Sequence, residues 1–237
     1  MHTPRLMAVL AHPDDESLGV GGTLAKYASE GVEVFLLTAT RGDRGRYRGH
    51  RPDDREHPGP LALANIRETE LRAAASALGV REVSLLDYRD QHLDRANPRE
   101  AVAGIVTYLR RVRPDVVVTF GPDGAYGHPD HVAISQFTTA AIVAAADPAF
   151  AFDGVERQAT PWPDWAVTTV IDTREFWSTV WSAVSCHESQ VTGYDRLKDL
   201  SPEHHEALWG SQSFYRAFST VNGGRARETD LFEGILK

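Results

Sequence analysis

Two segments of this chain carry a histidine followed by proline and aspartate, side chains that can bind a metal ion or move a proton. The first segment reads A-H-P-D-D-E from Ala11, and the second reads G-H-P-D-H from Gly127. Each follows a short apolar run and precedes a helical pattern, which places it in a turn between a strand and a helix. Open α/β sheets bind ligands outside the carboxyl ends of their strands. We therefore expect the two turns to converge on one site.

The residue types in these turns suit a catalytic metal centre. Two histidines and one carboxylate supply three ligands and leave a fourth position open, as in catalytic zinc sites. Zinc lowers the pKa of its bound water towards neutrality, and a neighbouring carboxylate that is not a ligand can take the proton. The adjacent pair Asp14 and Asp15 suits this division of roles. A purely structural interpretation, a helix start with acids at its positive end, explains the carboxylates but not His12.

The composition narrows the class of partner and the compartment. The chain has 237 residues and a formal net charge of -8, which disfavours nucleic acid because phosphate binding needs a basic face. A single cysteine, Cys186, allows no internal disulfide and is consistent with a reducing compartment. We expect no membrane span, because no apolar run is long enough, and no secretory signal, because the run at residues 6–11 is too short. These features predict a cytoplasmic protein.

Apolar runs that alternate with helical patterns predict an α/β fold. Such alternation is typical of an open, mostly parallel sheet with helices on both faces. No linker divides the chain, so we expect a single domain over residues 1–237 with a small C-terminal appendage, and an irregular insertion at 148–163. The expected strands span 6–11, 32–39, 82–88, 115–120 and 165–172, with an edge strand at 214–221; the expected helices span 18–30, 61–78, 98–113, 132–146, 173–189 and 202–209.

Residues 40–60 form a long polar segment without an apolar period. The segment contains six arginines among glycines and prolines, which prevent a regular helix or strand. Long loops without structure of their own are often lids or binding loops. We expect this segment to close over an anionic group of the substrate; the alternative is an ordinary solvated loop.

Five motifs together resemble the LmbE/PIG-L family of zinc-dependent N-acetylglucosaminyl deacetylases. They are A-H-P-D-D-E, G-G-T-L-A, R-E-T-E-L-R, G-H-P-D-H and H-E-S-Q, and they extend along most of the chain. The resemblance implies a Rossmann-like fold and a hydrolase that removes the N-acetyl group from an N-acetylglucosamine-type amino sugar or its conjugate. It also implies Zn²⁺ as the cofactor, with Fe²⁺ or another divalent metal as the alternative, and makes a homo-oligomer plausible.

The same resemblance implies roles for individual residues. Asp14 matches the general base, and Tyr126 matches a tyrosine that reaches the oxyanion. His128 matches the histidine that assists the leaving amine, and Asp130 beside it is expected to raise its pKa. In full, the metal ligands are His12, Asp15 and His131, the catalytic residues are Asp14, Tyr126, His128 and Asp130, and the sugar-binding residues are Arg67 and Asp90.

Other interpretations fit parts of this pattern. Two histidines and a carboxylate also suit a non-haem iron(II) oxygenase, which needs oxygen where hydrolysis does not. A nucleotide-binding module would use the glycines at 19–22, but G-x-G-G departs from G-x-G-x-x-G and the acidic turn would repel pyrophosphate. A non-catalytic sugar-binding module would have no need of Asp14. Arg67 and Glu70 fit an exposed helical face as well as sugar binding, and His187 fits the C-terminal end of a helix.

Overall fold

The computed structural model describes residues 3–146, 167–191, 195–217 and 227–233 of the chain. At its centre is a four-stranded parallel sheet in the order β3-β2-β1-β4. In the middle of the sheet, Leu6 of β1 lies between Val34 of β2 and Val116 of β4. The expected open parallel sheet is confirmed. Its strands are β1 (Arg5–Leu10), β2 (Glu33–Thr40), β3 (Glu82–Tyr88) and β4 (Val116–Val118).

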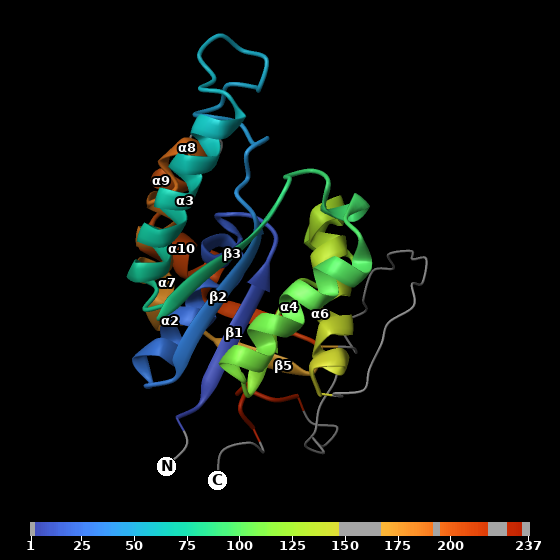
Figure 1. Cartoon of the computed structure of the whole chain (residues 1–237). Coiled ribbons are helices and arrows are strands. Elements are labelled where there is room, and N and C mark those ends of the chain that lie inside the picture. The colour runs from blue at the N-terminus through green and yellow to red at the C-terminus, as the bar shows by residue number, and fades with distance from the viewer. Residues whose placement is uncertain (1–2, 147–166, 192–194, 218–226, 234–237) are drawn as a thin grey trace.

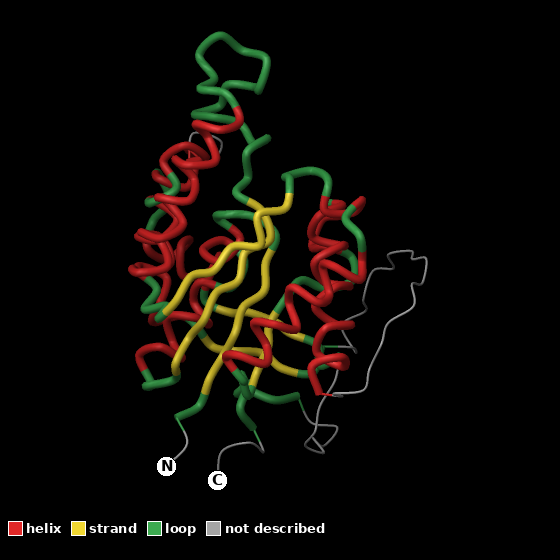
Figure 2. Tube along the Cα trace, viewed as in Figure 1, coloured by secondary structure: helices red, strands yellow, loops and turns green. Residues whose placement is uncertain are grey.

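Helices cover both faces of the sheet, and Figure 2 shows the red helices on either side of the yellow strands. In Figure 1, α2, α3, α7 and α10 lie on one side, and α4 and α6 lie on the other. This is the helix–sheet–helix layering that the sequence predicts. The bounds of these helices are α2 (Gly21–Ser29), α3 (Pro60–Ala77), α4 (Pro98–Val112), α6 (Pro129–Ala146), α7 (Trp177–Ser185) and α10 (Pro202–Trp209).

The sheet separates two hydrophobic cores. Side chains alternate along a strand, so neighbouring residues of β1 enter opposite cores. Leu6 and Leu10 pack with residues of α2, α3 and α7, whereas Met7 and Val9 pack with residues of α4 and α6. Because both faces are covered, β1 is apolar from Leu6 to Leu10, up to the point where the first histidine turn begins.

The expected fifth strand lies outside the parallel sheet. β5 (Thr169–Asp172) pairs antiparallel with β6 (Ser211–Phe214), and the two form a separate small sheet. Gln212 of β6 ties this sheet to α2, since its Oε1 accepts from the Thr23 backbone N–H at 2.9 Å. An apolar run does not specify its pairing partner, which is why the sequence pattern misplaced β5. The predicted insertion at 148–163 lies outside the described residues.

Several expected helices differ in extent from those observed. The helix expected at 18–30 is two helices, α1 (Asp15–Leu18) and α2, and the one expected at 132–146 begins earlier, at Pro129. The earlier start places Asp130 and His131 in the first turn of α6. No described helix is both long and apolar enough to span a membrane. The remaining short elements are η1 (Leu93–Arg95), α5 (Gly124–Gly127), η3 (Arg174–Phe176), α8 (Glu188–Val191) and α9 (Asp195–Lys198).

Two helical glycines give opposite predictions for the same substitution. A Cβ at Gly22 would lie 2.7 Å from the Cβ of buried Thr173, so Gly22→Ala is expected to destabilise the fold by about 1–3 kcal/mol. At Gly104 in α4 the nearest atom, in Leu86, is 3.5 Å away, so alanine fits and is expected to stabilise by about 0.5–1 kcal/mol. Urea denaturation measures both free energies of unfolding. If the free energy of unfolding changed in the same direction in both variants, the proposed difference in packing would be contradicted.

Candidate active site

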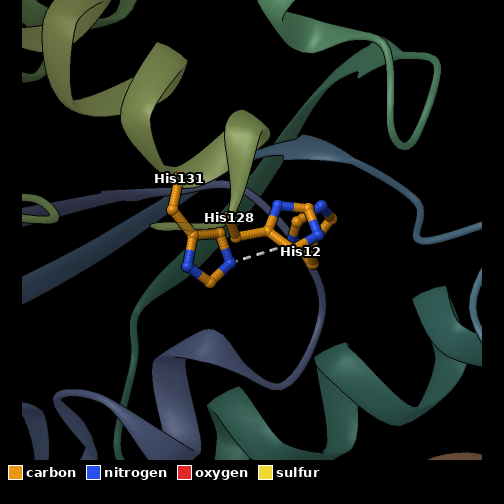
Figure 3. Close-up of side chains that lie close together, drawn as sticks. All are labelled: His12, His128 and His131. Atoms are coloured by element: carbon orange, nitrogen blue, oxygen red, sulfur yellow. Dashed lines mark hydrogen bonds between the residues drawn. The ribbon is translucent and has the colours of Figure 1, made fainter. Parts of the chain in front are cut away.

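The two histidine-containing turns lie against each other at the carboxyl ends of β1 and β4. His12 comes two residues after β1, and His128 and His131 stand at the start of α6. Figure 3 shows the three rings gathered together, with a dashed line between His12 Nδ1 and His131 Nε2, which are 3.1 Å apart. The ring of His128 stacks on that of His131 with centroids 4.7 Å apart. The convergence expected from the sequence is therefore present.

The side chains of His12, Asp15 and His131 present their donor atoms to one another. The two oxygens of the Asp15 carboxylate each face one imidazole: Oδ2 lies 3.7 Å from His12 Nδ1, and Oδ1 lies 3.4 Å from His131 Nε2. Ligand atoms around a tetrahedral zinc ion with bonds of about 2.0–2.1 Å are about 3.3 Å apart. The three buried side chains therefore match the size of a metal site. A nitrogen of His128 also lies within 4.8 Å of nitrogens of both other histidines.

Buried carboxylates hold the far side of the His12 ring. Its Nε2 lies 3.1 Å from both Asp130 Oδ2 and Asp90 Oδ1. Burial lowers the pKa of His12, but the hydrogen bonds to Asp130 and Asp90 outweigh it and raise that pKa to about 10. Asp130 is itself fixed, because its carboxylate accepts from the backbone N–H groups of Gln91 and Leu93. This arrangement leaves His12 Nδ1 facing His131, and metal-binding histidines are commonly oriented by a carboxylate in this way.

The second turn orients His131 through a backbone carbonyl. The Gly124 oxygen lies 3.3 Å from His131 Nδ1, which leaves Nε2 for the site. Gly124 has a φ of 63°, and a Cβ there would lie 2.8 Å from the Val132 side chain and 2.9 Å from the Val132 backbone nitrogen. Only glycine allows this turn to approach the first turn of α6 so closely. Gly124, three residues before the G-H-P-D-H motif, is thus part of how His131 is positioned.

Asp14, the residue before the proposed ligand Asp15, has a left-handed backbone conformation with a φ of 102°. Its Oδ2 accepts from Arg67 Nη2 at 3.1 Å. Burial raises the pKa of Asp14 to about 6, although the Arg67 guanidinium lowers it. Burial also raises the pKa of Asp15, but the hydrogen bond with His131 and the charge of His12 hold it below its usual value. Two adjacent carboxylates with separated pKa values are suited to different tasks, one as an acid or base and one as a ligand.

Arg67 and Glu70 are buried, so the alternative of an exposed helical face is wrong. Arg67 donates to the carbonyl oxygens of Gly42 and Pro13 and to Asp14, and Glu70 accepts from the Ser189 backbone at 2.7 Å. The structure therefore places Arg67 against Asp14 rather than on a solvated face. Sugar binding by Arg67 and by Asp90, which is 3% exposed, stays a prediction.

The expected pairing of Asp130 with His128 is wrong. The Asp130 carboxylate faces His12, and His128 Nδ1 accepts from the Asp130 backbone N–H at 3.2 Å. Burial lowers the pKa of His128, and the charges of His12 and His131 lower it further. The charge of Asp130 raises that pKa, as expected, but by less, so it lies below its usual value. Tyr126 is 75% exposed, with its ring centroid 6.0 Å from that of His128. Its action on the oxyanion stays a prediction.

Sequence reasoning missed a buried pair formed by Glu16 and His187. His187 Nε2 lies 2.6 Å from Glu16 Oε1, and both side chains are almost fully buried. The signals were present in the sequence, since Glu16 is the last acid of A-H-P-D-D-E and His187 opens H-E-S-Q. Glu16 was interpreted only as an acid near a helix start, and His187 as the end of a helix.

Comparison with known proteins gives matches along most of the chain. A family model, PIG-L, described as GlcNAc-PI de-N-acetylase, matches residues 7–142. The 1D-myo-inositol 2-acetamido-2-deoxy-alpha-D-glucopyranoside deacetylase of Rhodococcus erythropolis is 42% identical over 287 residues, covering 98% of this chain and 97% of the relative.

Solved structures show the same fold with different activities. An N,N'-diacetylchitobiose deacetylase from Pyrococcus horikoshii matches with a TM-score of 0.66 and 23% identity, over 89% of this chain and 84% of that one. A 4-carboxy-2-hydroxymuconate hydratase from Pseudomonas putida matches with a TM-score of 0.66 and 19% identity, over 93% and 100%. The fold alone does not define the reaction. The family model covers more than half of the sequence and the Rhodococcus relative covers nearly all of it, so the chain belongs to the PIG-L family.

Proposed function

We propose that this protein is a metal-dependent deacetylase that hydrolyses the acetamide of an N-acetylglucosamine-type sugar, with an inositol-linked sugar as the first candidate. The observation that carries the proposal is the position of Asp14. It lies next to the two-histidine, one-carboxylate cluster, is not needed as a ligand, and has a pKa raised by burial to about 6. The Rhodococcus relative, whose name specifies an N-acetylglucosaminyl-inositol substrate, supports the same reaction.

His12, Asp15 and His131 are the residues that would hold the metal ion. Two nitrogen donors and one oxygen donor suit Zn²⁺ and also Fe²⁺. The carboxylate behind His12 and the carbonyl behind His131 orient both rings as metal ligands require. A divalent ion held there polarises a carbonyl group and lowers the pKa of water. We favour Zn²⁺, because hydrolysis needs no redox chemistry.

The neighbouring side chains supply the proton transfers. Asp14 accepts a proton from the attacking water, and Arg67 holds the carboxylate in place through its 3.1 Å contact. The leaving amine then needs a proton, but the lowered pKa of His128 leaves that imidazole mostly neutral at pH 7. We therefore assign the return of the proton to Asp14, and hydrogen bonding to the reacting acetamide to neutral His128.

Asp130→Asn is expected to weaken metal binding by about tenfold to a hundredfold, because a neutral amide orients His12 less firmly and makes it less basic. Competition with a chromophoric chelator measures the affinity. Asp172→Asn is the matched control, since Asp172 is an exposed carboxylate paired with Arg174. Equal metal affinity in the Asp130 and Asp172 variants would contradict the proposed orientation of His12.

Released acetate is the direct test of the reaction. Metal-loaded protein is incubated without oxygen with N-acetylglucosaminyl-inositol, free N-acetylglucosamine and N,N'-diacetylchitobiose, and acetate is measured. We expect release, fastest from the inositol conjugate. Absence of acetate from all three sugars would contradict the proposal, and turnover that appears only with oxygen would favour the iron oxygenase instead.

The loop at residues 40–60 remains a predicted lid. Between the end of β2 at Thr40 and the start of α3 at Pro60 it contains no helix or strand, and its segment 51–56 is exposed. The loop is tied down closer to the site, where the Arg44 backbone N–H donates to Asp90 Oδ2 at 2.9 Å and the Arg48 backbone N–H donates to the Ser189 oxygen at 2.6 Å. We propose that the loop closes over the bound substrate. Its arginines would meet an anionic group only in a conjugate that carries one, since N-acetylglucosaminyl-inositol is uncharged. A cytoplasmic location and a homo-oligomer likewise remain predictions.

A further inference from the structure

His187 and Glu16 form a buried pair that none of the proposed chemical steps uses. His187 lies between α7 and α8 and is 2% exposed, and Glu16 in α1 is 1% exposed. His187 Nε2 donates to Glu16 Oε1 at 2.6 Å, and Ser17 Oγ donates to the same oxygen at 2.6 Å. Burial lowers the pKa of His187, but the charge of Glu16 outweighs it and raises that pKa above its usual value. The contact is thus a short, buried hydrogen bond between the two side chains.

The other oxygen of Glu16 holds the catalytic turn. Glu16 Oε2 accepts from the Asp14 backbone N–H at 3.0 Å. Asp14 has a φ of 102°, a conformation that is strained for a residue with a side chain and persists only when its surroundings enforce it. Glu16 enforces it by binding the amide of the strained residue. The contacts therefore run from His187 through Glu16 to the backbone of Asp14.

Burial explains why this arrangement needs His187. Glu16 is the third carboxylate in three consecutive residues, and a buried carboxylate without hydrogen-bond donors is unfavourable. His187 supplies a buried donor 2.6 Å from Glu16 Oε1. Without that donor, the Glu16 carboxylate would turn towards water, and the Asp14 amide would lose its acceptor.

We propose that His187 is a positioning residue which, through Glu16, holds the backbone turn that presents Asp14 to the reacting acetamide. The expected effect of His187 on kcat rests on the proposed deacetylase function, but its expected effect on the backbone turn at Asp14 does not. The rest of the H-E-S-Q segment braces the surroundings: the Ser189 hydroxyl donates to Glu70 of α3 at 2.5 Å, and Gln190 donates to the Arg46 oxygen at 2.5 Å. His187 is the member of this segment that contacts the catalytic turn.

The kinetic test compares His187→Leu, His187→Gln and His205→Leu. His205 is the control, because it is equally buried but is stacked among Trp177, Trp181 and Trp209.

For His187→Leu we expect kcat to fall by about tenfold to a hundredfold, the cost of a misplaced catalytic group, with KM and bound metal unchanged. His187→Gln should recover most of kcat, because its amide can donate to Glu16. His205→Leu should lower stability but not kcat; an equal loss of kcat in this control would overturn the proposal.

A second measurement, hydrogen exchange of the Asp14 amide, needs no enzymatic activity. It uses two separate single variants, so it still applies if one of them fails to fold. Hydrogen exchange of the Asp14 amide, followed by NMR, should be slow in the wild type and faster in His187→Leu and in Glu16→Ala. In a Glu16→Ala background, adding His187→Leu should change neither the exchange rate nor kcat further, because both residues act through one contact. Unchanged protection of the Asp14 amide in both single variants would overturn the proposal. If the wild type releases no acetate, the deacetylase function fails while this exchange result still decides the role of His187.

Discussion

Asp14→Asn is expected to lower kcat by at least about a hundredfold, because asparagine cannot accept a proton from the attacking water. The replacement is otherwise conservative. Asparagine has nearly the same shape, tolerates the left-handed backbone at φ 102°, and keeps an oxygen that can accept from Arg67. Bound metal and thermal stability should therefore stay close to those of the wild type. Initial rates of acetate release at saturating substrate measure the effect.

Metal content decides how a loss of activity in Asp14→Asn is explained. The proposed role requires one bound metal ion per chain in both the variant and the wild type. Near-normal kcat in the metal-loaded variant would contradict the assignment of Asp14 as the base. Loss of the metal along with activity would instead show that Asp14 is a ligand.

His131→Ala is expected to weaken metal binding by more than about a hundredfold, since removing a ligand costs more than altering the residue that orients it. We prefer His131 to His12 for this test. Removing His12 would also leave Asp90 and Asp130 as buried carboxylates without their partner, which can itself cost about 3–5 kcal/mol of stability. Elemental analysis after dialysis measures the bound metal.

His128→Ala is the matched control for His131→Ala. The two histidines lie three residues apart and their rings stack, but the Asp15 carboxylate faces His131. We expect His128→Ala to retain its metal and to lose turnover. The reverse result, with metal kept in His131→Ala and lost in His128→Ala, would exchange the roles of the two residues.

The helices, strands and turn that were predicted well from the sequence depend on local patterns. The apolar run at residues 6–11 and the H-P-D turn after it are read from neighbouring residues, and β1 and the His12 turn lie where the pattern places them. The same holds for β2, β3 and α3, whose observed bounds differ from the expected ones by one residue or less. Two such turns at the ends of adjacent parallel strands meet because of the sheet topology.

The parts that the sequence did not predict depend on contacts between distant residues. His187 is 171 residues from Glu16, and Asp130 is 118 residues from His12. Each of these residues fits a local interpretation, as a helix end or as the neighbour of His128, and only the folded chain selects the distant partner. The same reason explains β5, whose apolar pattern is satisfied by β6 rather than by the parallel sheet.

The most direct test of a metal-dependent deacetylase is to measure acetate release from N-acetylglucosaminyl-inositol while Zn²⁺ is titrated into metal-free protein. We predict no release without metal and a rate that rises linearly to a maximum at one ion per chain, with His131→Ala showing no rise over the same range. Full acetate release from the metal-free protein, or the same titration curve in His131→Ala, would contradict a reaction at the site formed by His12, Asp15 and His131.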